Sequence, residues 1–152
     1  MEVTSDINSV VAELLQSYKD ELKNSGHDAS GKLSSTAKYK VTFDGKWFEV
    51  FFVLDSTWKY LENGTKPHFP PTDEIERWIT VKRIIPSAYN GKVPTTKQLA
   101  YMIARGISRN GTKATKLLQN TIDSSTDLIN KLVDCIYSQI KNETDEEIDN
   151  SL

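Results

Sequence analysis

The residues that could carry acid–base, nucleophilic or metal chemistry are few in this chain of 152 residues, and they are far apart. Its only histidines are His27 and His68, and its single cysteine, Cys135, has no partner for an internal disulfide. None of them shows the spacing of a metal site, such as HExxH or CxxC. We therefore expect no catalytic residue, no metal site and no cofactor, and we do not expect an enzyme.

Each of these residues fits a simpler structural interpretation. His27 stands beside Asp28 in a polar stretch, as solvated loop residues do. His68 stands between a proline and a phenylalanine, which favours a structural or interface role over catalysis. Cys135 falls within a helical apolar pattern, which is typical of a small buried side chain.

Charge is strongly segregated along the chain, although the net charge is only −2. No Asp or Glu occurs between Arg77 and Ile122, whereas after Ile122 eight acidic residues accompany only two basic ones. We expect this asymmetry to serve a partner or self-assembly, and a basic face can also meet nucleic acid. The basic residues of this stretch are Arg77, Lys82, Arg83, Lys92, Lys97, Arg105, Arg109, Lys113 and Lys116.

The period of the apolar residues changes within the N-terminal half. Residues 5–23 carry apolar side chains at helical spacing, which predicts an amphipathic helix. Residues 33–54 switch to period two on either side of Asp44-Gly45, which is typical of a hairpin turn. The strand 47–54 is apolar on both faces apart from Glu49. We therefore expect it to be central in a sheet, or covered by a helix or a neighbouring subunit.

Helix signals dominate the rest of the chain. Thr72 is placed to cap a helix to about Ile84. Core packing, rather than stacking on nucleobases, is expected for the aromatic residues Trp47, Phe48, Phe51, Phe52, Trp58 and Trp78. Thr95 and Gln98 match a capping box that begins a second helix. That helix is expected to bury Leu99, Met102, Ile103 and Ile107, and its Gly106 is expected to admit another backbone.

From residue 113 to about 141 the pattern predicts one long helix, or two helices with a break at 124–126. The acidic residues 142–152 are expected to form a disordered tail. The prediction is a single α+β domain over 1–141, with an N-terminal helix, an antiparallel sheet with a long hairpin, and a helical C-terminal half. No run of about 18 apolar residues predicts a membrane span, and the acidic N-terminus does not resemble a signal peptide. We therefore expect a cytoplasmic protein without membrane contact.

Two motifs resemble those of a known family. Gly64-Thr65-Lys66-Pro67-His68-Phe69-Pro70-Pro71, followed by Trp78, resembles the "GT-x-PHFPP … W" signature of the tail-completion (neck, or virion-morphogenesis) proteins of tailed bacteriophages. The run from Leu99 through Ala104-Arg105 to Gly111-Thr112-Lys113 is similar to the "LA-x-x-IAR-x-I-x-x-x-GTK" segment of the same proteins.

The resemblance implies a structural virion protein without an active site. Such proteins form homo-oligomeric head–tail connector rings that join the portal and its adaptors to the tail. Host cytoplasm is then the compartment of assembly, the virion neck is the final location, and packaged DNA is a further candidate contact. The chain departs from the family where many members continue into a "PF…PA" segment. The interface candidates are Gly64, Thr65, Pro67, His68, Phe69, Pro70, Pro71, Trp78, Arg105, Arg109, Lys113 and Lys116.

A competing hypothesis needs no resemblance. The basic face over 77–116 suits a small cytoplasmic nucleic-acid-binding or regulatory module. The two hypotheses differ in a simple observable. A neck protein assembles into rings or binds a portal, whereas a nucleic-acid-binding module binds DNA with a steep dependence on salt.

Overall fold

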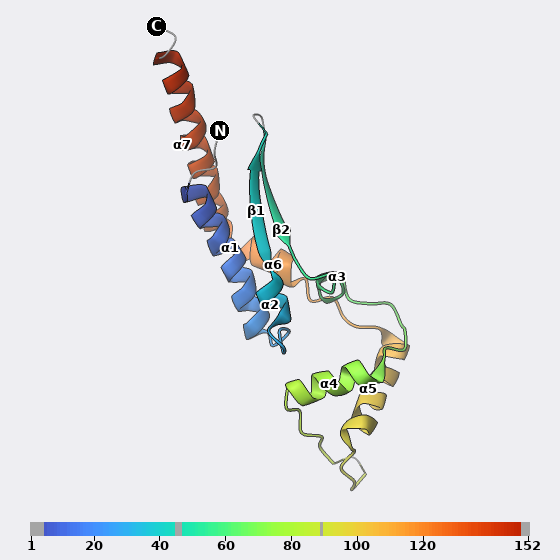
Figure 1. Cartoon of the computed structure of the whole chain (residues 1–152). Helices are drawn as coiled ribbons and strands as arrows, with labels where there is room; N and C mark the ends of the chain where they lie inside the picture. The colour runs from blue at the N-terminus through green and yellow to red at the C-terminus, as the bar shows by residue number, and fades with distance from the viewer. Residues whose placement is uncertain (1–4, 45–46, 89, 150–152) are drawn as a thin grey trace.

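The computed structural model describes residues 5–44, 47–88 and 90–149, and these residues fold into two lobes (Figure 1). The described elements are seven helices and one two-stranded antiparallel sheet, so the α+β class is confirmed. A larger lobe holds both ends of the described chain (Figure 1). Its elements are α1 (Ser5–Asn24), α2 (Lys32–Thr36), β1 (Lys38–Phe43), β2 (Phe48–Val53), α3 (Trp58–Asn63), α6 (Leu117–Ser124) and α7 (Thr126–Asp149).

The smaller lobe, called here the arm, consists of α4 (Thr72–Val81) and α5 (Thr96–Asn110), which pack against each other. Two extended connectors, residues 64–71 and 111–116, join the arm to the larger lobe (Figure 1). The chain therefore leaves the larger lobe once, builds the arm, and returns beside its point of departure.

The core of the larger lobe is built around α1. Its apolar stripe at three- and four-residue spacing is buried against α7, α6, α2 and β1, as the sequence predicts. The fully buried side chains of α1 include Ile7, Val10, Val11 and Leu22. Tyr18 is also buried, and burial raises the pKa of its phenol, with the carboxylates of Glu62 and Asp28 adding to the effect.

The strand prediction for residues 33–36 was wrong, because these residues belong to the short helix α2. The reason is local: the Asp28 carboxylate accepts hydrogen bonds from the Leu33 and Ser34 N–H groups, at 3.0 and 3.1 Å. These bonds satisfy donors that the first turn of a helix leaves unpaired. Gly31, at φ 73°, allows the chain to turn into this helix.

The hairpin of β1 and β2 is confirmed, with Lys38 opposite Val53 and Phe43 opposite Phe48. Asp44 and Trp47 bond across its end, while the predicted turn residue Gly45 lies outside the described residues. β2 is not central, because the described sheet has only two strands. No described helix covers its second face either: Phe51 and Val53 are 47% and 56% exposed. Trp47 is exposed too, so the predicted burial of the aromatic residues fails here.

In the arm, the capping box of Thr95 and Gln98 is confirmed by both of its hydrogen bonds. The predicted buried stripe of α5 is confirmed only in part, because Leu99, Ile103 and Ile107 are half-buried. Ala100 and Ala104 are fully buried, and Met102 is exposed. Small side chains let two helices approach closely, and α4 packs against α5. Gly106 has no neighbouring group within 4 Å, so the predicted close backbone is absent from the described chain.

The ends of several helices differ from the prediction. α4 is preceded by Pro71 rather than capped by the Thr72 side chain, and it ends at Val81. The C-terminal helical region has the predicted break, since α6 ends at Ser124 and α7 begins at Thr126.

The acidic tail was predicted to be disordered from residue 142, but α7 continues to Asp149. Glutamates are good helix formers, and Gln139 donates to Glu143 one turn along the helix, at 3.2 Å. Residues 150–152 lie outside the described residues. Among the helices that are described, none combines the length and hydrophobicity needed to cross a membrane.

Candidate functional site

The two connectors are joined by a pair of threonines that are 47 positions apart in the sequence. Thr65 and Thr112 form an isolated antiparallel bridge. The Thr65 N–H donates to the Thr112 carbonyl at 3.1 Å, and the Thr112 N–H donates to the Thr65 carbonyl at 3.2 Å. Their hydroxyl oxygens are 3.0 Å apart. The first and second sequence motifs therefore meet at one joint.

A glycine precedes each threonine and makes this approach possible. Gly64 has φ 70° and ψ −171°, and Gly111 has φ 68° and ψ −163°. This region of backbone space is essentially restricted to glycine. A Cβ at Gly64 would collide with the Thr112 carbonyl oxygen, and one at Gly111 would collide with the Thr65 carbonyl oxygen. Both glycines are thus required by conformation and by space.

The joint is built from an identical tetrapeptide used twice. Asn-Gly-Thr-Lys occurs at 63–66 and again at 110–113. In each copy the Asn is the last residue of a helix, α3 or α5, and the Gly ends that helix. The pairing of the two motifs was not predicted, although this repeat is a signal for it in the sequence.

A second set of hydrogen bonds fastens the returning connector to α3. The Leu61 carbonyl accepts from both the N–H and the hydroxyl of Thr115, at 3.0 and 2.7 Å. The Glu62 carboxylate accepts from the N–H groups of Leu118 and Gln119, at 2.9 and 3.1 Å. A carboxylate at this position also complements the helix dipole of α6. These partners were not predicted either, because no local pattern marks a helix cap supplied from 56 positions away.

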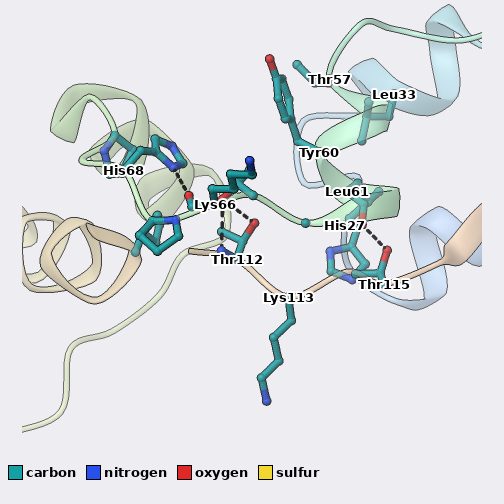
Figure 2. A pocket seen from close by; sticks show the side chains of 15 residues that line it. His27, Leu33, Thr57, Tyr60, Leu61, Lys66, His68, Thr112, Lys113 and Thr115 are labelled. Carbon is teal, nitrogen blue, oxygen red and sulfur yellow. Dashed lines mark hydrogen bonds between the residues drawn. The ribbon is translucent and has the colours of Figure 1, made fainter. Parts of the chain in front are cut away.

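An open cleft of about 890 Å³ surrounds the joint. Figure 2 shows Thr57, Tyr60 and Leu33 on the side of the larger lobe and His68 on the opposite side, with the connectors between them. His27 also lines the cleft, on the side opposite His68 (Figure 2). The ring Nδ1 of His68 lies 2.9 Å from the Lys66 carbonyl.

The cleft lining contains few titratable side chains. The described lining residues are mostly apolar or hydroxylated, and none of them is Asp or Glu. No group of three or more His, Cys, Asp or Glu side chains is placed to hold a metal ion, within the part of the chain that the structure describes. The cleft lining therefore presents apolar surface, hydroxyl groups and the ammonium groups of Lys66 and Lys113.

The sequence-predicted candidates divide between the cleft and the arm. Gly64, Thr65, Pro67, His68, Pro70 and Lys113 line the cleft. Phe69 leaves it and contacts the ring of Tyr101 on α5, with ring centroids 5.9 Å apart. Lys116 does not line the cleft; it adopts φ 51° immediately before α6.

The remaining candidates lie on the arm. Pro71 precedes α4, and Trp78 of α4 is 42% exposed with the Lys82 ammonium 5.4 Å from its ring centroid. Arg105 and Arg109 are exposed on α5. The structure therefore does not gather all the candidates into one site.

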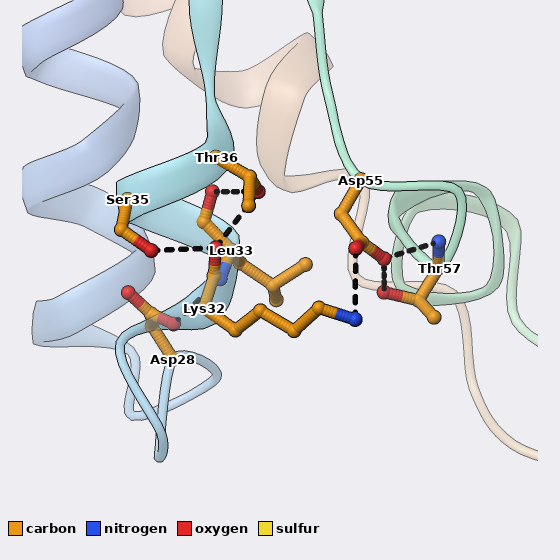
Figure 3. Close-up of polar contacts among 7 residues, drawn as sticks. All are labelled: Asp28, Lys32, Leu33, Ser35, Thr36, Asp55 and Thr57. Carbon is orange, nitrogen blue, oxygen red and sulfur yellow. Dashed lines mark hydrogen bonds and ion pairs between the residues drawn. The ribbon is translucent and has the colours of Figure 1, made fainter.

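One wall of the cleft is held in place by Asp55 (Figure 3). Its carboxylate accepts from the hydroxyl and the N–H of Thr57, at 2.7 and 3.0 Å, and pairs with the Lys32 ammonium at 3.1 Å. The Thr57 hydrogen bonds, followed by Lys32, lower the pKa of Asp55 to about 2. This cluster ties α2 to the start of α3.

Comparisons with protein-family models, with curated proteins and with solved structures found no match to this chain.

Proposed function

We propose that this chain is a structural virion protein of a tailed phage, forming part of the head–tail connector (neck) ring that joins the portal to the tail. The observation that carries the proposal is the joint. The two motifs that resemble the tail-completion proteins are far apart in the sequence, and they meet through Thr65 and Thr112. A shared joint gives these two motifs a common structural purpose.

We infer that the joint fixes the position of the arm, away from the larger lobe. The arm exposes large apolar side chains, among them Trp78, Val81 and Tyr101, at 42%, 50% and 55%. Ile85, just after α4, is 89% exposed. Large apolar side chains exposed together on one lobe favour a protein–protein contact there. A ring requires each subunit to offer one patch to a different patch of its neighbour, and a projecting arm suits such a contact.

The cleft supports assembly rather than catalysis. Its described lining provides apolar surface, hydroxyls and two lysines but no carboxylate, and Asp28 beside His27 accepts hydrogen bonds from the first turn of α2. Among the described hydrogen bonds, neither histidine is bonded to a nucleophile. The described bond of the His68 ring is to the Lys66 backbone carbonyl.

Electron microscopy of the purified full-length chain tests the proposal. The chain is imaged alone and after mixing with the portal and adaptor proteins encoded near it. Closed rings, or density added to the end of the portal, are the expected result. A chain that remains single under both conditions would contradict a neck role.

A second candidate function is nucleic-acid binding by the arm. The observation that favours it is the absence of Asp and Glu between Arg77 and Ile122, together with the exposure of Lys97, Arg105 and Arg109 on α5. Titration with duplex DNA at several salt concentrations separates the two functions. A nucleic-acid-binding module is expected to lose affinity with a log–log slope of about −0.9 per phosphate contact.

A further inference from the structure

The C-terminal helix carries an apolar stripe without a partner among the described residues of this chain. Val133, Tyr137 and Ile140 of α7 are 58%, 69% and 44% exposed. Their spacing of four and three residues places them on one side of the helix. We call these three residues the α7 stripe. α1 packs elsewhere on α7, where Gln139 is buried and Lys131 pairs with Glu13.

Acidic residues line one flank of the α7 stripe. Asp127, Asp134 and Asp145 are all exposed, and their spacings of seven and eleven residues keep them on one side of the helix. That side adjoins the stripe, because Asp134 follows Val133 by one residue. Lys141 is exposed on the same flank, seven residues after Asp134, so the free surface of α7 is an apolar centre bordered by three carboxylates and one ammonium group.

The arm carries the complementary surface. A cleft of about 670 Å³ lies where the chain enters α5; it is called here the arm cleft. Its lining residues are Lys92, Val93, Pro94, Lys97, Gln98, Tyr101 and Met102. Val93, Tyr101 and Met102 are 65%, 55% and 46% exposed, and the two lysines flank this apolar floor. The exposed Arg105 lies one turn beyond Tyr101.

The two surfaces belong to oppositely charged parts of the molecule. Residues 72–113 carry eight basic and three acidic side chains, whereas residues 114–152 carry three basic and eight acidic ones. Figure 1 shows the arm and the C-terminal part of α7 at opposite ends of the molecule. The arm cleft therefore cannot reach the α7 stripe of its own chain.

We infer that the arm cleft of one copy receives the α7 stripe of a second copy. Tyr137 then enters the apolar floor, and Asp134 faces Lys97 across the rim. The contact is heterologous, so a linked pair still has one free arm and one free α7, and further copies link head to tail into a ring or a filament. This inference rests on the proposed function and deepens it by naming the subunit contact.

The observations favour a second copy over DNA as the occupant of the arm cleft. Phosphates would satisfy Lys92 and Lys97, but they would leave Val93, Tyr101 and Met102 without an apolar partner. DNA binding would also leave the α7 stripe unexplained. A second copy accounts for both surfaces with one contact.

The experiment measures self-association of the full chain by analytical ultracentrifugation, up to about 1 mM, which detects even a weak contact. Tyr137→Ala removes the central side chain and is expected to weaken association by about 30-fold, as a buried aromatic anchor does. Lys97→Glu and Asp134→Lys are expected to weaken association singly and to restore it in part when combined. Phe51→Ala and Lys38→Glu, on the exposed face of the hairpin, are matched controls expected to associate like the unmodified chain.

Mixing tests the head-to-tail geometry. Lys97→Glu with Arg105→Glu disables the arm, and Asp134→Lys with Tyr137→Ala disables α7. Each double variant is expected to be monomeric alone. Their mixture is expected to form a species of twice the 17.2 kDa chain mass and nothing larger, because only one intact contact can form.

Three results would overturn the inference: a chain that is monomeric at about 1 mM, variants that associate like the controls, or a mixture that stays monomeric. Loss of DNA binding in the Lys97→Glu variant with unchanged self-association would assign the arm cleft to nucleic acid instead. The proposed function fails on a different result, the absence of rings and of portal binding in the microscope. Rings that persist in both double variants would overturn this contact alone.

Discussion

Gly64 and Gly111 hold the joint together through conformation rather than through side chains. Both adopt positive φ with extended ψ, and both face a carbonyl oxygen of the opposite connector. A conformational requirement and a steric requirement coincide at these positions. Their effect on stability can be separated by comparison with a glycine that meets only the first requirement.

Gly111→Ala is therefore expected to destabilise the fold by roughly 3–5 kcal/mol, the range for mutations that combine backbone strain with a clash. Gly91→Ala is the matched control, since Gly91 has φ 74° and no group within 4 Å of its Cβ position. Its cost is expected to be about 1 kcal/mol, from strain alone. Urea unfolding measures both. Equal losses at the two positions would show that the joint is not tightly packed.

Asp55 makes part of the free energy of unfolding depend on pH. Its pKa is lowered from 3.8 to about 2, so the folded state favours the carboxylate. A lowered folded pKa gives stability that is present above the unfolded pKa and is lost as the pH falls toward the folded one. The advantage of the wild type over Asp55→Asn is therefore expected to shrink between about pH 4 and pH 2. Thermal melts at several pH values measure it, with Asp20→Asn as control. A constant difference would exclude this role.

At the scale of elements, the hairpin shows why apolar content alone misleads. β2 is apolar on both faces, and that pattern is typical of a central strand. Here Phe52 packs against the core, whereas the preceding residue, Phe51, faces outward. The sequence pattern reports which residues could be buried. It does not report whether a partner within the chain covers them.

Phe52→Ala is expected to cost about 3 kcal/mol, near the low end for a core phenylalanine because Phe52 is only partly buried. Phe51→Ala is expected to cost less than about 1 kcal/mol in the isolated chain, as an exposed substitution does. Chemical denaturation of the two variants compares the faces directly. A large loss at Phe51 in dilute solution would mean that this face is covered after all.

Substitution of Gly106 tests whether another group lies close to α5 at this position. It lies inside a helix with open space at its Cβ position. Gly106→Ala is therefore expected to stabilise the chain by about 0.5–1 kcal/mol, since alanine has the higher helix propensity. Thermal unfolding measures this gain. If the variant instead destabilises the chain, α5 has a close neighbour at this position.

Signals from residues close in sequence predicted the helices and strands well, but they did not predict which distant residues would contact each other. The helix over 5–23, the hairpin and the capping box of Thr95 each depend on residues close in sequence, and each is confirmed. Two of the failures share another cause. The α6 cap from Glu62 and the choice of Ala100 over Met102 as the buried residue depend on contacts that spacing alone does not encode. The α2 cap from Asp28 is different, because its partners are only five and six residues away and the local signal was missed.

The candidate site shows the same division. Both motifs were recognisable, and the surface location of the proline-rich connector follows from its residue types. Their meeting at Thr65 and Thr112 was not predicted, although the repeated Asn-Gly-Thr-Lys could have suggested it. A repeat identifies two similar pieces of chain. Only the fold shows that they lie against each other.

At the scale of the whole molecule, the basic and the acidic parts of the chain lie at opposite ends of the structure. The basic arm projects from one end, and the acidic C-terminal part of α7 projects from the other (Figure 1). Exposed ion pairs contribute roughly 0–1 kcal/mol each. Such a distribution is therefore suited to orienting and aligning subunits more than to holding them together. Apolar contacts must supply most of the affinity.

Salt separates these two contributions. Reversal of Arg105 and Arg109 to glutamate, and separately truncation after Lys141, are expected to weaken association and to flatten its dependence on salt. Both changes reduce the opposite charges that attract the copies at long range. The melting temperature of Arg105→Glu/Arg109→Glu is expected to stay near that of the wild type, because both side chains are exposed. Sedimentation from about 0.05 to 1 M salt measures the slope. Variants that assemble like the parent at every salt concentration would show that the charge asymmetry has no part in assembly, and DNA titration of the arm would then be the decisive measurement.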